Sequence, residues 1–259
     1  MNMIRVDHLS VSFGGLRAVD DVSFEIPDGR ITGLIGPNGA GKTTVFNALA
    51  GHVPVTSGRV LLQGEDITRL KPHERAIRGL ARTFQIPQEF TRLTVLENFM
   101  AAAFAPAGEN VFNVMFQRGR FEAEERRIYH TARGTMAFLE LERVAGERAG
   151  NLSGGQKKLL ELGRALMRDP KIILLDEIGA GINRTLLAKI SDKIKLLNRE
   201  RGLTFCLIEH DLDYVSKLCD SVVVMAQGRL LMQGSVAEVR SDERVIEAYF
   251  GGGKYEMPA

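Results

Sequence analysis

Alternating apolar and polar residues dominate the first part of the chain. Apolar side chains recur from Met1 to Phe13, and Val22 to Ile26 alternates strictly. Such patterns are typical of strands with one buried face. The compact apolar run Ile31 to Ile35 predicts a buried strand, and the helical spacing of Thr44 to Ala50 predicts a helix. A further strand is expected at Arg59 to Gln63.

The pattern changes between about Thr94 and Ala145. Glu122 to Leu141 is rich in charge and carries apolar residues at helical spacing, which predicts a charged amphipathic helix. One proline and two glycines interrupt Ala105 to Gly119, so a loop or broken helix is expected there. This part therefore differs from the strand-rich segments on either side.

Helical and strand patterns alternate again in the last hundred residues. The predicted helices are Ser153–Arg168, Arg184–Arg201 and Asp211–Leu218, and the predicted strands are Lys171–Asp176, Thr204–Glu209 and Ser221–Met225. Such alternation indicates βαβ units and a largely parallel sheet that binds ligands at the carboxyl ends of its strands. We expect one α/β domain with a core formed by residues 1–90 and 160–235. Residues 91–159 would be an inserted helical subdomain, and 236–259 a C-terminal helix and flexible tail.

Composition narrows the class of protein. The 259 residues are 44% hydrophobic and 25% charged with a formal net charge of +2, which excludes a wholly disordered chain and gives no general attraction to nucleic acid. Apolar runs such as Val222 to Ala226 are far shorter than the roughly 20 residues of a membrane-spanning helix. Neither a secretion signal nor a metal or disulfide pattern at Cys206 and Cys219 is evident, so a cytosolic chain is expected.

A phosphate-binding loop is the strongest motif. Gly36-Pro37-Asn38-Gly39-Ala40-Gly41-Lys42-Thr43, followed by Thr44, fits the pattern at every fixed position and lies between a predicted strand and a predicted helix. Glycines let backbone N–H groups converge on phosphate oxygens, and the helix adds its positive end. Lys42 would contact the β- and γ-phosphates, and the Thr43 hydroxyl would bind Mg²⁺. The alternative is an ordinary glycine-rich turn.

Two carboxylates end the strand at 171–176. Asp176 would lie at the strand tip beside the phosphate loop, where it could hold Mg²⁺ through water, and Glu177 could polarise the attacking water. Many strands end in acidic turns, so this pair gains its meaning from the phosphate loop.

A second candidate anion site follows Leu152. Ser153-Gly154-Gly155-Gln156 predicts a capping box, which by itself only starts a helix well. The same glycine-rich helix start also exposes N–H groups that could bind a phosphate. The phosphates of this chain's own loop already occupy another helix N-terminus, so a second copy of the chain could present this site.

Together these motifs resemble the ATP-binding subunits of ABC transporters over roughly Ile4 to Phe250, with Leu152 to Gln156 matching the family signature. The resemblance implies a RecA-like phosphate-loop core with a mixed, mainly parallel sheet, an antiparallel portion near the N-terminus and a helical insertion. It implies that Phe13 stacks on adenine, although a core position in an alternating strand is the alternative. It also implies that Gln85 links the Mg²⁺ site to a membrane partner and that His210 contacts the γ-phosphate.

The resemblance further implies partners. Two chains, identical or paralogous, would dimerise head to tail with MgATP between one phosphate loop and the other chain's signature, so Ser153 and Gly155 would act in trans. Closure and hydrolysis would drive separate transmembrane permease subunits, served indirectly by a solute-binding protein, with no nucleic acid partner. The chain would lie peripherally on the cytoplasmic face of the plasma membrane. Phe90, Leu93, Val95 and Phe99 would either receive the permease or form the core of the helical subdomain.

Finer motifs are similar to those of branched-chain amino acid importers. They are Arg82-Thr83-Phe84-Gln85, Leu93 to Asn98, Ile208 to Asp211 and Val245 to Tyr249. Importers of urea or other amides are the alternative, and a non-transport ATPase acting on ribosomes or DNA is the alternative of another class. Ile178 and Arg184 stand where the family usually has proline, which we expect to loosen this segment and alter hydrolysis. This departure suggests a further alternative, a regulatory cassette that does not hydrolyse ATP.

Overall fold

The structure is a computed structural model that describes residues 2–83, 89–103 and 118–250, without the side chains of 118–121 and 250. No helix in that part of the chain is both long and apolar enough to cross a membrane. By its internal contacts the chain divides into two compact units. Unit 1 comprises Met1–Arg82, Lys171–Gly179 and Ser191–Ala259, and unit 2 comprises Thr83–Pro170 and Ala180–Ile190.

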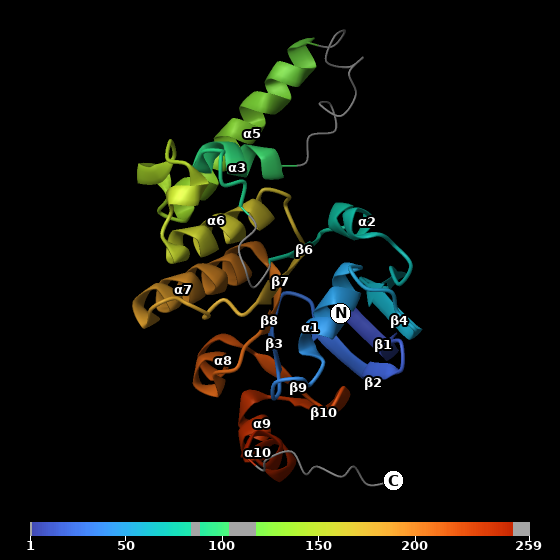
Figure 1. The fold of residues 1–259 in the computed structure, drawn as a ribbon. Coiled ribbons are helices and arrows are strands. Elements are labelled where there is room, and N and C mark those ends of the chain that lie inside the picture. Colours follow the sequence, from blue (N-terminus) through green and yellow to red (C-terminus); the bar gives the residue numbers. More distant parts are fainter. Residues whose placement is uncertain (1, 84–88, 104–117, 251–259) are drawn as a thin grey trace. The chain divides into compact units, whose positions relative to one another are not determined.

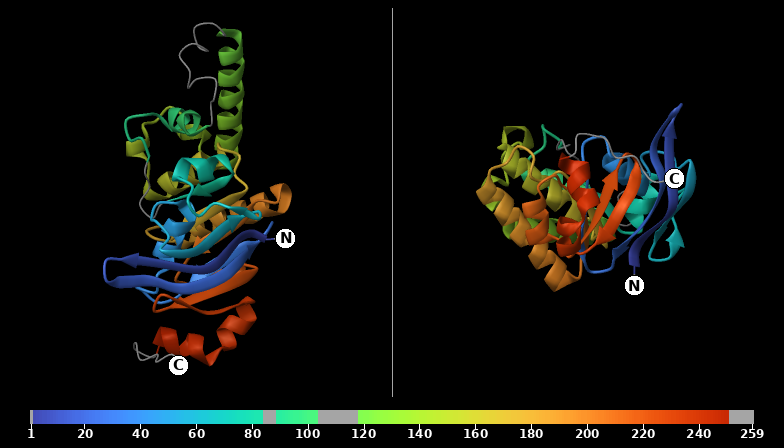
Figure 2. Two further views of the ribbon diagram at one scale, coloured as in Figure 1. Left: turned by 90° about the vertical axis from the view of Figure 1, so that its right-hand side faces the viewer. Right: turned by 90° about the horizontal axis from the view of Figure 1, so that it is seen from below.

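An antiparallel sheet forms the N-terminal part of unit 1. Strands β1 (Asn2–Phe13) and β2 (Leu16–Pro27) make a long hairpin that is visible in Figure 2, followed by β4 (Ser57–Leu62) and β5 (Glu65–Asp66) in the order β2-β1-β4-β5. Cross-strand pairs such as Ile4 with Ile26 and Val6 with Phe24 bury the apolar face. The alternation in the sequence follows from this one-sided burial.

The second sheet of unit 1 is mainly parallel and carries the expected ligand edge. Its order is β10-β9-β3-β8-β7-β6, and only the β9–β10 pair is antiparallel (Figure 1). The strands are β3 (Ile31–Ile35), β6 (Leu80–Arg82), β7 (Ile172–Asp176), β8 (Thr204–Ile208), β9 (Ser221–Ala226) and β10 (Arg229–Gly234). Every residue of β3, β7 and β8 is buried, which explains their compact apolar runs. The predicted α/β class with a mixed sheet is therefore confirmed.

The helices that lie entirely within unit 1 are α1 (Lys42–Ala50), α2 (Pro72–Ile77), α8 (Leu212–Leu218), α9 (Val236–Ser241) and α10 (Glu243–Phe250). Arg75 of α2 is 1% exposed and its guanidinium binds backbone carbonyls, including those of Ala48 and Leu49 in the last turn of α1. A cation at a helix C-terminus is favourable because the carbonyl ends carry partial negative charge. Arg75 thereby fixes the far end of α1, the helix that starts at the phosphate loop.

Unit 2 is helical in its described residues. It contains α3 (Val95–Ala102), α5 (Arg118–Phe138), the 3₁₀ turns Glu142–Val144 and Ala149–Asn151, α6 (Gly154–Leu166) and the first turns of α7 (Arg184–Arg201). The whole of α6 belongs here because Phe99 of α3 and Leu139 pack at Gly163 of α6. Leu186 of α7 likewise packs closely on Gly155, so the unit extends past the predicted subdomain limits of 91 and 159.

The predicted permease-facing residues of unit 2 divide between surface and core. Val95 and Phe99 are fully buried, Leu93 is half-buried, and Phe90 is 50% exposed with the Arg164 guanidinium over its ring. The core alternative is therefore right for Val95 and Phe99. Most of the predicted loop at 105–119 lies outside the described residues.

Candidate functional site

The phosphate loop joins β3 to α1 in unit 1, as the sequence predicts. Gly36 opens the loop with a φ of 148°, and a Cβ added there would lie 2.1 Å from the carbonyl oxygen of Met225 in β9. Only glycine allows so close an approach of the two backbones. Asn38, Gly39 and Thr43 are exposed, so the loop presents its middle and the first turn of α1 to a ligand.

Lys42 is the buried cation of the loop. Its ammonium donates to the carbonyl oxygens of Gly36, at 2.7 Å, and Pro37, at 2.9 Å, and the residue is 5% exposed. Burial lowers the pKa of Lys42, and the negative charges of Glu177 and Asp176 partly oppose that shift. The structure thus brings the loop lysine and both predicted carboxylates into electrostatic contact.

Asp176 ends β7 and forms an ion pair that the sequence does not reveal. Its Oδ2 lies 3.0 Å from Nη2 of Arg82 in β6, and the two side chains are 5% and 6% exposed. Nη1 of Arg82 also donates to Oδ1 of Asn47 in α1, at 2.5 Å. Arg82 therefore ties the carboxylate to the helix of the phosphate loop. The only clue in the sequence is an arginine at the end of a short strand, and nothing there indicates its partners.

The donor set fits Mg²⁺. Thr43 offers an exposed hydroxyl and Asp176 a carboxylate, and oxygen ligands of this kind are those that Mg²⁺ prefers in nucleotide sites. No cluster of three or more His, Cys, Asp or Glu side chains suited to a metal occurs in the described residues, so the remaining ligands would come from phosphates and water. Gln85, the third predicted metal ligand, lies outside the described residues.

Glu177 has an unusual backbone conformation directly after β7. Its φ is 46°, in the left-handed region that costs energy for a residue with a Cβ, and its N–H donates to the carbonyl of Ile208 at 3.1 Å. Its Oε1 lies 2.9 Å from Nε2 of His210. The backbone turn therefore aims the carboxylate at the histidine that follows β8, and the two predicted residues meet.

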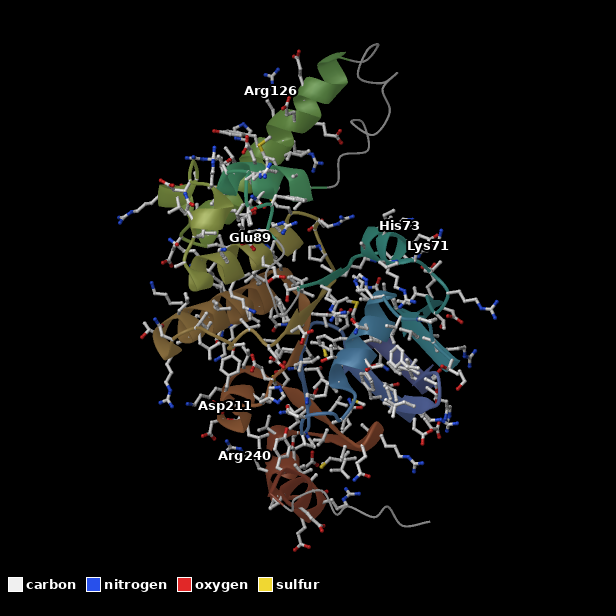
Figure 3. All side chains as sticks on the ribbon, in the orientation of Figure 1. Lys71, His73, Glu89, Arg126, Asp211 and Arg240 are labelled. Carbon is white, nitrogen blue, oxygen red and sulfur yellow. The ribbon has the colours of Figure 1, made fainter. Side chains whose placement is uncertain are left out.

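The segment after Glu177 is tied to the residue before His210. The carboxylate of Glu209 is buried, 6% exposed, and accepts a hydrogen bond from the N–H of Gly179 at 3.0 Å. Burial raises the pKa of Glu209, and the backbone N–H donors of Gly179 and His210 oppose that rise. Figure 3 labels Asp211, which caps α8 directly after the histidine. The sequence gives no sign that Glu209 joins the segment after Glu177 to the segment of His210.

Phe13 stands at the end of β1 and is 48% exposed. This exposure excludes the alternative of a core position, whereas nearby apolar residues of β1, such as Val11, are fully buried. An exposed ring at a strand end is available for stacking, and the adenine contact remains a prediction.

The signature segment starts α6 in unit 2. The hydroxyl of Ser153 accepts the N–H of Gln156, and Oε1 of Gln156 accepts the N–H of Ser153 at 2.9 Å, so the predicted capping box is confirmed. Ser153 and Gly154 are exposed, which leaves the helix start open to a ligand. Nearby, Lys157 pairs with Glu89 at 2.7 Å.

The two residues that replace family prolines are built into the fold. Ile178 is 6% exposed, and Arg184 starts α7. The side chain of Asn183 accepts the N–H of Leu186 at 2.9 Å and so caps that helix. The effect of Ile178 and Arg184 on hydrolysis remains a prediction.

Comparison with known proteins places the chain. The ABC transporter family model matches residues 19–180, and a model of the branched-chain amino acid ATP-binding cassette transporter matches residues 229–255. A probable branched-chain amino acid transport ATP-binding protein LivG of Archaeoglobus fulgidus is 38% identical and covers 99% of this chain and 98% of its own. The relative covers nearly all of both units, and the ABC transporter model includes the phosphate loop, the signature segment, Asp176 and Glu177.

Solved structures agree. The ADP conformation of MJ1267, an ATP-binding cassette of an ABC transporter, is 38% identical with a TM-score of 0.84, over 97% of this chain and 99% of its own. The dimeric structure of MJ0796, a bacterial ABC transporter cassette, is 25% identical with a TM-score of 0.74, over 90% and 99%. The chain therefore belongs to the ABC transporter family, as one of its ATP-hydrolysing ATP-binding subunits.

Proposed function

We propose that the chain powers an importer of branched-chain amino acids, or of closely related solutes such as other amino acids or amides. The observation that carries this proposal is the pairing of Glu177 with His210 at the end of a phosphate-loop sheet, on a chain whose C-terminal residues 229–255 match the branched-chain transporter model. The site supports ATP hydrolysis, and the match of residues 229–255 supports branched-chain amino acids as the class of solute.

In the proposed reaction a water oxygen attacks the γ-phosphorus of ATP while the bond to the bridging oxygen breaks, which gives ADP and inorganic phosphate. The Glu177 carboxylate orients the water and receives its proton. Lys42 contacts the phosphate oxygens, and His210 holds Glu177 and the γ-phosphate. Mg²⁺, held by Thr43 and Asp176, and by Gln85 as the resemblance implies, would neutralise charge on the β- and γ-phosphates.

The second anion site supports a dimer. Ser153 and Gly154 are exposed at the start of α6, where free N–H groups and the helix dipole favour a phosphate. We propose that a second chain, identical or paralogous, presents Ser153, Gly154, Gly155 and Gln156 to the ATP bound by this chain's loop. Transmembrane permease subunits and a solute-binding protein would complete the transporter, with this chain on the cytoplasmic face of the membrane.

A pair of substitutions tests the site. Glu177→Gln should bind ATP with nearly unchanged affinity but lower kcat by about 100-fold or more, since general-base contributions are typically 10² to 10⁴. Lys42→Ala should instead lose ATP binding. Glu200→Gln, an exposed glutamate of α7, is the matched control and should keep wild-type kcat. Normal hydrolysis by Glu177→Gln together with normal binding by Lys42→Ala would overturn the assignment.

The solute class needs a different experiment. Permease subunits and a binding protein that co-purify with the chain should be identified, and the binding protein screened with leucine, isoleucine, valine, urea and short amides. Binding of a branched-chain amino acid is the expected result. A binding protein that takes only urea or amides would contradict the proposed solute and leave the ATPase assignment intact.

A further inference from the structure

Arg82 contacts both elements of unit 1 that carry the proposed Mg²⁺ ligands. Its strand, β6, lies next to β7 in the parallel sheet and contacts α1 (Figure 1). Nη2 of Arg82 lies 3.0 Å from Oδ2 of Asp176, the last residue of β7, and Nη1 lies 2.5 Å from Oδ1 of Asn47 in α1. One planar, rigid guanidinium therefore joins the carboxylate to the helix that begins at the phosphate loop.

Asn47 places this contact on the same side of α1 as Thr43. Residues four apart in a helix lie on one face, about 6 Å apart along the axis, and Thr43 and Asn47 have this spacing in Lys42–Ala50. The helical turn between them is held by backbone hydrogen bonds and moves as one piece. A displacement at Asn47 is therefore passed to the Thr43 hydroxyl.

The guanidinium of Arg82 is held in one place by its surroundings. The side chains of Arg82 and Asp176 are 6% and 5% exposed, so their attraction is screened little by salt or water. Cζ of Arg82 lies 6.0 Å from the centre of the Phe46 ring, and Phe46 is a fully buried residue of α1. A cation over an aromatic ring is favourable, so Arg82 has a second contact with α1 beside its bond to Asn47.

Mg²⁺ tolerates little displacement of its ligands, because it demands near-octahedral geometry at short metal–oxygen distances. We propose that Arg82 is a positioning residue of the Mg²⁺ site: its guanidinium fixes the Asp176 carboxylate relative to the helix of Thr43 and so raises the affinity of the nucleotide-bound protein for the cation. The inference rests on the proposed function, in which Thr43 and Asp176 hold Mg²⁺. Arg82 acts through these two residues.

The affinity for Mn²⁺ tests this role without any measurement of hydrolysis. Mn²⁺ takes the same oxygen ligands as Mg²⁺, and its free form is detected by electron paramagnetic resonance. The full chain is kept in excess over ADP, so that the nucleotide is bound, and is titrated with Mn²⁺. Arg82→Met should raise the Kd for Mn²⁺ about 10- to 100-fold, the usual cost of losing a residue that orients a metal ligand. The Kd for ADP in EDTA, measured by calorimetry, should stay close to that of wild type, because Lys42 and the loop are unchanged.

Asn47→Ala separates positioning from folding. It keeps the ion pair of Arg82 with Asp176 and removes only the hydrogen bond to α1. The Kd for Mn²⁺ should rise about 10-fold, the low end for a hydrogen bond with a charged donor. Ile26→Ala is the matched control for lost stability, because Ile26 is fully buried in β2 and its truncation destabilises a fold about as much as the loss of a buried ion-pair partner. That control should leave the Kd for Mn²⁺ unchanged.

Other outcomes overturn the proposal. If Arg82 only stabilises the fold, Arg82→Met behaves like Ile26→Ala, with a lower melting temperature and an unchanged Kd for Mn²⁺. If the guanidinium competes with the cation for Asp176, Arg82→Met binds Mn²⁺ more tightly. An unchanged Kd in Asn47→Ala also overturns the proposal, and this variant alone decides if Arg82→Met does not fold. Failure of the ADP-bound wild type to bind Mn²⁺ would contradict the proposed Mg²⁺ site itself, and this inference with it.

Discussion

Nε2 of His210 and Oε1 of Glu177 lie 2.9 Å apart, across the ends of the parallel neighbours β8 and β7. An ionised carboxylate only accepts hydrogen bonds, so the imidazole is the donor. The contact joins the two residues that follow adjacent strands, and the left-handed backbone of Glu177 makes it reachable. The histidine is therefore placed to orient the carboxylate.

His210→Ala should lower kcat about 100-fold, because removal of one well-placed donor typically costs 10²- to 10³-fold. The KM for ATP should change much less, since Lys42 and the loop remain. Steady-state phosphate release measures both parameters.

The double variant His210→Ala/Glu177→Gln should be no slower than the slower single variant, because residues that act as a unit are strongly non-additive. Multiplied effects in the double variant would show that the two side chains act independently.

Arg82→Met should destabilise unit 1 by about 3–5 kcal/mol, the usual cost of removing one partner of a buried ion pair. The substitution keeps an apolar stem and leaves the Asp176 carboxylate without this guanidinium. Urea unfolding followed by circular dichroism measures the change. Arg30→Met is the control, because Arg30 and Asp220 are 62% and 41% exposed and such a pair is worth about 0–1 kcal/mol. Equal losses in both variants would contradict the structure.

Gly163→Ala should destabilise the protein by about 1–3 kcal/mol, as overpacking does in other cores. A Cβ there would lie 2.3 Å from Phe99 and 2.8 Å from Leu139. Gly134→Ala in α5 is the matched control, since no atom lies within 4 Å of its added Cβ and alanine favours a helix by about 0.5–1 kcal/mol. Thermal unfolding should therefore move in opposite directions for the two variants.

Glu209 should make stability depend on pH. Burial raises its pKa in the folded state above the ordinary 4.5, so the neutral carboxyl stabilises the fold below that pH. This contribution is lost as pH rises through the folded-state pKa. Glu209→Gln keeps an acceptor for the Gly179 N–H and has no such loss.

The melting temperature of Glu209→Gln, relative to wild type, should accordingly increase from pH 4 to pH 7. Glu200→Gln, at an exposed position, should show a constant difference over the same range. A constant difference for Glu209→Gln as well would contradict this prediction, because ionisation of the buried carboxyl would then not destabilise the fold.

Local pattern predicts much of this fold, for physical reasons. The runs that become β3, β7 and β8 are apolar because every residue is buried, and α7 matches its predicted bounds. The strands β6 and β10 are short or only partly buried, so no periodicity marks them. The predicted helix at 122–141 ends at Phe138, because Glu140 adopts a positive φ of 60°.

The functional site, too, can be predicted only in part from the sequence. The loop around Lys42 can be predicted from the sequence, because the glycines that give the backbone its freedom and the lysine that gives the charge lie close together along the chain. Arg82 and Glu209 gain their roles only from segments far away in sequence, namely β7 and Gly179. No local pattern encodes such tertiary contacts.

The bonds from the Lys42 ammonium to the carbonyls of Gly36 and Pro37 bear on how ATP affinity arises. Removing an ammonium from water costs free energy. Here that cost arises when unit 1 folds, and two carbonyl oxygens replace the hydrating water. A phosphate reaching the loop therefore exchanges partners with a charge that is already dehydrated and immobile. Part of the affinity for ATP therefore depends on the folding of unit 1, so a variant that loosens the loop should lose both folding stability and ATP affinity.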